Sequence, residues 1–275
     1  MSIMASKKTI STPHGEIGLS ESGEGNPLLM IHGLFASGET FNELRERIPR
    51  GIRAIAPDLP NCGDSTASST FKPTWDGYAR SVIGAADSLG LDRFDLLGHS
   101  MGGGISITLA ATYPDRVKRL VLVDAISLPY PVPLKGRLPL KPILGELLFR
   151  MYGRKMFVDY FENDVFFDSS RMDRGKVLRL FDTFADKRAS ALEALRATAN
   201  PSPVGEIVEK VSCPTLILWG EKDALVPLEV GRQLEGLIPG GELHVINNCG
   251  HSPVEENPDE AARIIWKFLD EMKGM

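Results

Sequence analysis

The chain has 275 residues, of which 43% are hydrophobic and 24% are charged, and its formal net charge at pH 7 is −5. This is the composition of an ordinary globular protein, which excludes a disordered or low-complexity chain, and the length suits one large α/β domain with an insertion. The net negative charge argues against a nucleic-acid-binding protein, because such binding needs a basic surface.

The cysteines and the N-terminal segment predict a compartment. Cys62, Cys213 and Cys249 are far apart and lack the spacing of a metal site, so we expect free thiols, a reducing compartment and no bound metal. The first residues contain no apolar run long enough for a signal peptide, and no stretch approaches the roughly 20 apolar residues of a membrane span. We therefore expect a cytoplasmic protein with no membrane-spanning segment and no cofactor. Nothing in the sequence indicates an oligomeric state.

Segments of two kinds alternate along the chain and predict strands and helices. After an expected edge hairpin over residues 12–23, the short apolar runs that predict strands cover residues 27–33, 53–58, 94–100, 119–125, 214–220 and 242–248. The segments with apolar residues at helical spacing cover residues 39–48, 74–90, 103–113, 228–237 and 258–273. Most of the predicted strands are apolar throughout, as in strands covered on both faces. The pattern predicts an α/β fold with a doubly wound, mostly parallel sheet.

One region without strand signals interrupts this alternation. Residues 126–203 begin proline-rich and continue with helical segments that are dense in aromatic residues. We expect a helical cap inserted between two strands of the sheet, so that residues 1–125 and 204–275 form the core domain. The alternative is a pair of sheet helices joined by long loops.

One serine lies where a strand must turn into a helix, in the stretch LLGHSMGGG at residues 96–104. Gly98 and Gly102 lack side chains, as a tight reversal of the chain around Ser100 requires. Such a turn raises Ser100 Oγ above the carboxyl edge of the sheet and directs the Met101 amide, at the helix N-terminus, into the same space. A serine hydroxyl is a weak nucleophile, so it needs a base and an acid that orients the base.

This stretch resembles the nucleophile elbow, G-x-S-x-G, of the α/β-hydrolase superfamily, and the chain is similar to the serine esterase and lipase branch with a helical cap. The resemblance extends from the hairpin to the last helix and implies the chain order serine, acid, histidine. The expected acid is Asp223, in PTLILWGEKDALVP after a late strand, and the expected base is His251, in HVINNCGHSPVEENP. Asp124 is the alternative acid, because some members carry their acid after that earlier strand.

The other histidines are weaker candidates for the base. His14 lies in the edge hairpin, His244 lies inside a predicted strand, and the side chain of His99 must point away at the elbow. His32 precedes a loop that the resemblance assigns to binding an oxyanion, and we interpret it as a hydrogen-bonded structural residue of that loop.

The resemblance also implies an oxyanion hole. Its amide donors are expected at Met101 and Leu34, with Phe35 as the neighbouring alternative to Leu34. Relatives usually carry Gly-His in a nearby loop where this chain has Asn61 and Cys62, in PDLPNCGDS. No catalytic role is expected at these two positions, so the departure concerns the shape of the loop beside the site.

The cap predicts an apolar substrate. Aromatic residues gather in its middle, and we expect Phe149 and Phe157, with Phe35 of the core, to bind the substrate, although burial against the sheet domain is the alternative for each. The cap is basic over residues 135–155 and acidic over residues 159–173. A basic rim would recruit an anionic substrate, an acyl carrier or a membrane surface, but the sequence favours neutralisation between adjacent helices.

These features together predict a serine hydrolase that cleaves a small or medium apolar carboxylic ester, lactone or thioester through an acyl-enzyme. Ser100 disfavours the dehalogenase and epoxide-hydrolase branches of the superfamily, which use aspartate as the nucleophile. Three alternatives remain: hydrolysis of a carbon–carbon bond on the same scaffold, cofactor-free perhydrolysis, and a ligand sensor that retains the triad. The predicted partner is therefore a small apolar molecule.

Overall fold

The computed structural model describes residues 6–271, and its centre is a nine-stranded sheet. The strands are β1 Ser6–Thr12, β2 Gly15–Gly23, β3 Gly25–Ile31, β4 Gly51–Pro57, β5 Thr66–Ala67, β6 Phe94–His99, β7 Val117–Val123, β8 Thr215–Gly220 and β9 Gly241–Ile246. Their order in the sheet is β1-β2-β4-β3-β6-β7-β8-β9, with β5 paired to β2. The hairpin β1–β2 is antiparallel and lies at one edge, β2 runs antiparallel to β4, and the remaining neighbours from β4 to β9 are parallel.

Helices connect most of the strands. The α-helices are α1 Asn42–Arg45, α2 Trp75–Ser88, α3 Met101–Thr112, α4 Leu134–Arg137, α5 Pro142–Met151, α6 Arg154–Tyr160, α7 Arg174–Asp186, α8 Arg188–Thr198, α9 Ser202–Gly205, α10 Leu228–Leu237, α11 Pro253–Glu256 and α12 Pro258–Glu271. Short 3₁₀ turns occur at Gly38–Phe41, Leu138–Leu140, Ser169–Arg171 and Val208–Lys210, and a π turn occurs at Phe161–Val165. None of the helices within residues 6–271 is long and apolar enough to cross a bilayer.

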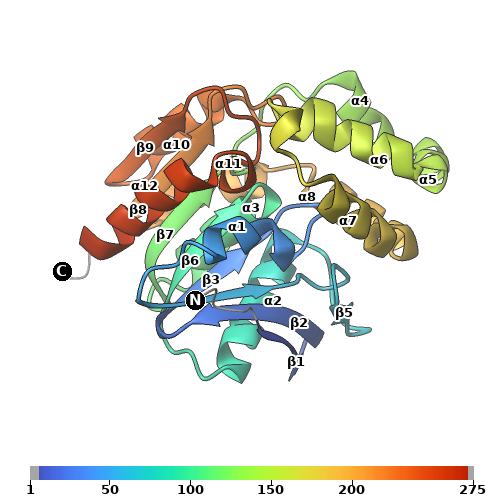
Figure 1. The fold of residues 1–275 in the computed structure, drawn as a ribbon. Helices are drawn as coiled ribbons and strands as arrows, with labels where there is room; N and C mark the ends of the chain where they lie inside the picture. The colour runs from blue at the N-terminus through green and yellow to red at the C-terminus, as the bar shows by residue number, and fades with distance from the viewer. Residues whose placement is uncertain (1–5, 272–275) are drawn as a thin grey trace.

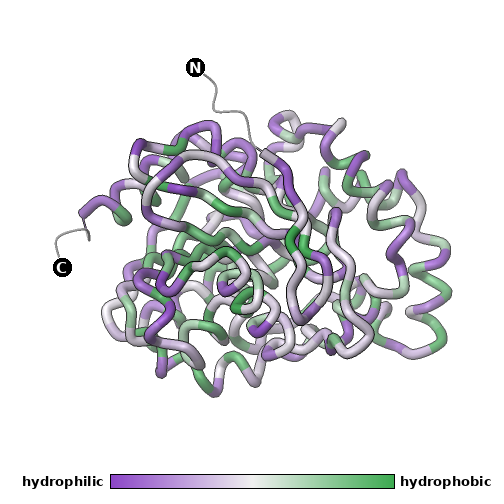
Figure 2. Tube along the Cα trace, turned by 90° about the horizontal axis from the view of Figure 1, so that it is seen from below, coloured by the Kyte–Doolittle hydropathy of each residue, from purple (hydrophilic) through white to green (hydrophobic). Residues whose placement is uncertain are grey.

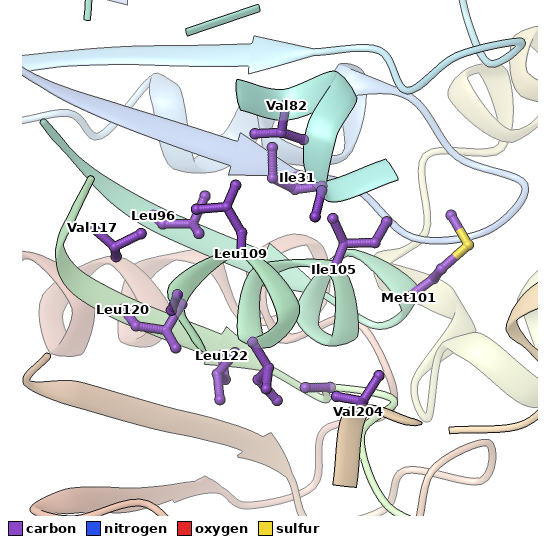
Figure 3. Close-up of a cluster of buried hydrophobic side chains, with 14 of the residues drawn as sticks. Ile31, Val82, Leu96, Met101, Ile105, Leu109, Val117, Leu120, Leu122 and Val204 are labelled. Carbon is purple, nitrogen blue, oxygen red and sulfur yellow. The ribbon is translucent and has the colours of Figure 1, made fainter. Parts of the chain in front are cut away.

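Helices cover both faces of the sheet, which explains why its central strands are mostly apolar (Figure 1). The exception is a buried ion pair between Asp95 of β6 and Arg119 of β7. In β3, Leu29 and Ile31 belong to a core with α2, α3 and α10, while Leu28 and Met30 belong to a second core with α1 and α12. Successive side chains of a strand point to opposite faces, so a strand between two helical layers needs apolar residues at every position. Figure 3 shows the first core, in which α3 packs among side chains of β3, β6 and β7. The expected doubly wound, mostly parallel sheet is confirmed.

Two predicted helices differ in extent from the observed ones. The segment 39–48 is a 3₁₀ turn followed by the short α1, which ends at Arg45. Pro49 disfavours a helical conformation at the residue before it, and Gly51 adopts a φ of 87° as β4 begins, so the helix stops early. The last helix, predicted to residue 273, is observed to Glu271, and residues 272–273 lie outside the described part of the chain.

The segment between β7 and β8 carries α4 to α8 and lies to one side of the sheet, at the upper right in Figure 1. We call these helices and the turns between them the cap. Aromatic and aliphatic side chains of α5 to α8 form a core of their own, separate from the two sheet cores. The short α9 straddles the predicted boundary at residue 203, and Val204 already packs into the sheet core.

Candidate active site

Ser100 occupies a strained turn between β6 and α3. Its φ of 56° and ψ of −120° are unfavourable for a residue with a side chain, at a typical cost of about 1–3 kcal/mol. A Cβ on Gly98 would lie 2.3 Å from the carbonyl oxygen of Gly102, and one on Gly102 would lie 2.1 Å from that of Ile31. The Ser100 backbone is held by its own N–H, which donates to Val123, and by its carbonyl, which accepts from Ile126. The glycines are therefore required by close backbone approach on both sides of the turn.

The three side chains expected to form a triad meet at the carboxyl edge of the sheet. His251 Nε2 lies 2.8 Å from Ser100 Oγ, and His251 Nδ1 lies 2.7 Å from Asp223 Oδ2. A carboxylate only accepts hydrogen bonds, so Nδ1 carries the hydrogen, Nε2 is the free base, and Ser100 donates to it. The three residues are separated by 28 and 151 positions in the chain but form one continuous line of hydrogen bonds.

Asp223 is fixed by backbone amides as well as by the histidine. Its Oδ1 accepts from the N–H groups of Leu225 at 2.8 Å and Val226 at 2.9 Å, in the turn that follows β8. Its side chain is 0% exposed. This leaves Oδ2 directed at His251, which is the geometry needed to hold the imidazole in one tautomer.

Asp124, the alternative acid, lies beside this line but is not part of it. It follows β7, has a φ of 44° and is completely buried. Its Oδ1 accepts the Gly220 N–H at 2.9 Å, whereas its buried Oδ2 has no hydrogen-bond partner among the described residues. Burial, reinforced by the negative charge of Asp223, raises the pKa of Asp124 well above its ordinary value. The structure pairs His251 with Asp223 and indicates a protonated, structural Asp124.

The same three side chains are poorly arranged for a metal ion. Asp124, Asp223 and His251 bring possible ligand atoms within 4.8 Å of one another. Both ring nitrogens of His251 are already hydrogen-bonded, to Asp223 and to Ser100, so a metal would have to break that line. The arrangement fits proton transfer better than metal ligation.

The loop that carries His251 is held by contacts that sequence reasoning did not identify. The Nε2–H of His99 donates to the carbonyl of His251 at 2.7 Å, and the His251 N–H donates to Val165 of the cap, also at 2.7 Å. Burial, with the nearby His251, lowers the pKa of His99 to about 3, so its ring is neutral. Glu256 accepts from the amides of Gly250 and Asp168, which joins the same loop to the cap. His99, Val165 and Asp168 come from segments far from His251 in the chain, and no local motif marks these contacts or the role of Glu256.

The expected oxyanion donors lie next to the serine. Met101 is the first residue of α3, and the first amides of a helix have no partner within it. A Cβ on Gly33 would lie 2.9 Å from Ser100 Cβ, so the loop containing Leu34 runs directly against the serine. His32 stabilises this loop, since its Nδ1 donates to the Gly33 carbonyl at 2.7 Å and its Nε2 accepts the Leu59 amide at 2.9 Å.

The loop that departs from the family pattern lies beside the site. Asn61 adopts a φ of 62° and accepts the Ala67 amide at 2.9 Å through its side chain. Burial, with the negative charge of Asp58, raises the pKa of the Cys62 thiol to about 12, so this cysteine is not a thiolate nucleophile. Both residues line a small cavity of about 30 Å³ together with Leu34.

Phe35 connects this part of the core to the aromatic cluster of the cap. Its ring centroid lies 5.9 Å from that of Phe149, 6.2 Å from that of Tyr160 and 5.5 Å from that of Phe184. Phe157, also expected to bind substrate, is 0% exposed and packs inside the cap core. Phe35 also packs against Phe157, with the two ring centroids 6.5 Å apart, so both cap residues meet Phe35 at the junction of cap and core, and Phe157 is the more deeply buried of the two.

Buried polar contacts also join the cap to the core. Lys176 of α7 is 3% exposed, and its ammonium lies 2.6 Å from a Glu255 oxygen and 3.1 Å from a Glu43 oxygen. The Lys187 ammonium donates to the carbonyls of Gly63 and Ser65. The cap is thus anchored on both the histidine loop and the first half of the sheet.

The charges of the cap are neutralised only in part. Lys135 pairs with Asp164, which matches the expected neutralisation between neighbouring segments, whereas Lys155 pairs with Asp159 within α6 itself. No ion pair within residues 6–271 involves Arg137, Lys141 or Arg150, although all three belong to the basic half.

Comparison with known proteins identifies the family of the chain and finds relatives that are named for two kinds of reaction. The model of a family described as the alpha/beta hydrolase family matches residues 28–264. A 2-hydroxy-6-oxo-6-phenylhexa-2,4-dienoate hydrolase of Burkholderia cepacia is 28% identical, and the alignment covers 92% of this chain and 91% of the relative. A 2-hydroxymuconate semialdehyde hydrolase of Pseudomonas putida is 26% identical over 94% and 92% of the two chains. The solved structure of a thermophilic esterase from Thermogutta terrifontis superimposes with a TM-score of 0.81 at 26% identity, covering 97% of this chain and 99% of the esterase.

Proposed function

The chain belongs to the alpha/beta hydrolase family, and from this we propose that it is a serine hydrolase that cleaves a carbon–carbon bond beside a ketone in a 2-hydroxy-6-oxo-dienoate. The observation that carries the proposal is the hydrogen-bonded line from Ser100 through His251 to Asp223. The substrate class is supported by the two dienoate and semialdehyde hydrolases, which align over more than nine-tenths of both chains. These relatives favour carbon–carbon hydrolysis, an alternative at the level of sequence, over ester hydrolysis.

In this reaction the substrate first tautomerises: its 2-hydroxyl loses a proton and the carbon next to the ketone gains one, which gives a conjugated 2-keto acid with a CH₂ group beside the ketone. Ser100 Oγ then attacks the ketone carbon while its proton passes to His251 Nε2. The C–C bond then breaks, and its electron pair goes to the leaving carbon, which the conjugated keto acid stabilises as an enolate. The proton held by His251 completes that first product. Water next attacks the acyl-enzyme, with His251 taking a proton from it, and releases a carboxylic acid and free Ser100. The net reaction consumes one water.

The negative charge that develops on the ketone oxygen needs two donors. We assign them to the Met101 and Leu34 amides, since α3 begins at Met101 and the Gly33–Leu34 loop lies against Ser100. A fixed donor of this kind is typically worth about 3–4 kcal/mol of barrier lowering. Asp223 keeps His251 in the tautomer that accepts the serine proton.

Hydrolysis of an apolar ester is the second candidate, and the surroundings of the cap favour it. A dienoate carries a carboxylate, which a lysine or arginine side chain would bind. The cations of the cap that contact the core or the cap interior already have other partners. Lys176 is paired with carboxylates, and Lys187 and Arg188 donate to backbone carbonyls. The Phe35–Phe149 junction is aromatic and suits an apolar acyl group.

A direct comparison of substrates tests the choice. The purified protein is assayed with 2-hydroxy-6-oxo-6-phenylhexa-2,4-dienoate, by loss of its conjugated absorbance, and with p-nitrophenyl butanoate, by nitrophenol release. We expect kcat/KM for the dienoate to exceed that for the ester by at least about a hundredfold, which is roughly 2.7 kcal/mol of transition-state binding. The opposite order would make the protein an esterase. Ser100→Ala should lose about 10⁴–10⁶-fold in kcat on either substrate; retained turnover would refute both candidates.

A further inference from the structure

The described residues expose large apolar side chains almost entirely in one stretch of the cap, residues 132–156. Its most exposed members are Leu134, Ile143, Leu144, Leu147, Met151 and Met156, which we call the cap patch. Ile143 is 84% exposed, and outside this stretch Phe167 is the only large apolar side chain of comparable exposure within residues 6–271. In Figure 2 the outer edge of the cap, at the right, shows hydrophobic residues among hydrophilic ones. Such a concentration marks an interaction surface rather than scattered surface residues.

Helix α5 has apolar residues on two opposite sides. Gly145 and Phe149 are buried against the rest of the cap. Ile143, Leu147 and Met151 follow one another at intervals of four and therefore form a stripe along the helix. At about 100° per residue this stripe lies nearly opposite the buried side. The cap core therefore covers one apolar side of α5, and the other apolar side faces solvent.

Unpaired positive charge surrounds the stripe. Residues 132–156 contain six basic residues and a single acid, Glu146, whereas the whole chain has a net charge of −5. Glu146 pairs with Arg196 of α8. Of the six cations in residues 132–156, Arg137, Lys141 and Arg150 form no ion pair with the described residues. Arg137 precedes α5, Lys141 is its N-cap residue and Arg150 lies in its last turn. The cap patch is therefore both apolar and cationic.

We propose that the cap patch docks the protein on an anionic lipid bilayer, with α5 lying in the plane of the interface. A helix in this position places apolar side chains at the boundary of the acyl chains and its Lys and Arg residues among anionic headgroups. The exposed stripe and the cations around it meet both requirements. A second copy of the chain is a poorer occupant, because a two-fold contact would bring the same basic patch against itself. The proposal is independent of which bond the active site cleaves.

Vesicle co-sedimentation tests the proposal. The full-length protein is mixed with vesicles of equal parts phosphatidylglycerol and phosphatidylcholine, or with phosphatidylcholine alone. We expect binding to the anionic vesicles, and its loss when NaCl is raised from about 0.02 M to about 0.5 M, where charges are screened within a few ångströms. Equal binding to both vesicles, or binding to neither, would overturn the proposal.

Three variants separate the contributions of the patch. Arg137→Gln/Lys141→Gln/Arg150→Gln should reduce the partition coefficient by about fivefold per cation, or about a hundredfold in all. Ile143→Ser/Leu147→Ser/Met151→Ser should reduce it by at least about tenfold. The matched control removes three exposed cations of α10 and α12, away from the cap (Figure 1), as Arg232→Gln/Arg263→Gln/Lys267→Gln.

The control variant should bind as the wild type does, within about twofold. An equal loss in the control would attribute binding to total charge and overturn the assignment to the cap patch. Circular dichroism verifies that each variant is folded, and the substituted side chains are exposed, so we expect no change in melting temperature. Sedimentation velocity without vesicles provides the second measurement. If the wild type is a dimer and the variant Ile143→Ser/Leu147→Ser/Met151→Ser is a monomer, the cap patch binds a second copy of the chain and the proposal is wrong.

Discussion

Replacement of Asp124 by asparagine tests whether this buried carboxyl is protonated and structural. Asp124 is 0% exposed, its Oδ1 accepts one hydrogen bond, from Gly220, and its Oδ2 has no hydrogen-bond partner among the described residues. One of its oxygens lies within 4.8 Å of an Asp223 oxygen. An asparagine keeps the acceptor for Gly220 and supplies an N–H where the protonated acid has its O–H. We expect Asp124→Asn to keep kcat/KM within about threefold of the wild-type value, roughly 0.6 kcal/mol, whereas Asp223→Asn should lose about 10⁴-fold in kcat.

The same substitution has a consequence for stability that depends on pH. Burial and Asp223 raise the pKa of Asp124 in the folded state, while the unfolded chain titrates near the ordinary value of about 4. Above that pH the unfolded state loses its proton first, so the free energy of unfolding of the wild type falls as pH rises toward the folded-state pKa. Asparagine does not titrate. The variant should therefore match the wild type near pH 4 and exceed its stability at pH 8, with a difference that grows as the pH rises between these values.

Urea unfolding followed by circular dichroism at pH 4, 6 and 8 measures this difference directly, and initial rates on the preferred substrate measure activity in the same buffers. A variant that is less stable than the wild type at pH 8 would mean that the Asp124 carboxylate is ionised and stabilising. Activity that falls as far in Asp124→Asn as in Asp223→Asn would refute the division between structural and orienting acid.

Three further substitutions address the neighbourhood of the site. Gly33→Ala places a Cβ 2.9 Å from Ser100 Cβ and should lower kcat at least about tenfold with little change in melting temperature; unchanged steady-state kinetics would argue against this loop as an oxyanion donor. Lys176→Met leaves the partly buried carboxylates of Glu43 and Glu255 without their cation and should cost about 1–3 kcal/mol in urea unfolding, with part of the loss recovered by adding Glu255→Gln. Glu256→Gln weakens the hydrogen bonds from the Asp168 and Gly250 amides and should lower kcat more than it lowers stability. A lower melting temperature with unchanged kcat would limit the role of Glu256 to packing.

Local chemistry made the sheet and the elbow predictable from the sequence. Central strands such as β3, with its unbroken apolar run over residues 28–31, are rich in apolar residues because both faces are covered, and that requirement is visible in the chain itself. The glycines around Ser100 also predict the turn from the sequence, because only residues without a Cβ fit where α3 and β3 approach each other. The segment 39–48 is the exception: its spacing predicts one helix, but the structure has a 3₁₀ turn and a helix that ends at Arg45, and Pro49 disfavours its continuation through Ile48.

Contacts between distant segments could not be obtained in this way. The family resemblance favoured Asp223 over Asp124 as the acid, although each of them follows a strand of the sheet. Only the folded arrangement shows that the turn after β8 directs Asp223 at His251, while Asp124 bonds to the Gly220 amide. The choice depends on how two strand ends and one loop meet in space, and no local pattern encodes that.

The cap shows the same division between local and tertiary information. Its sequence determined that the segment is helical, aromatic and unevenly charged, because those properties follow from spacing and composition. Only the tertiary structure decided that Phe157 lies inside the cap, that Glu256 joins the cap to the histidine loop, and that one side of α5 faces solvent. Helical periodicity shows which side chains share a side of a helix, but what covers that side is determined by packing against segments far away in the chain.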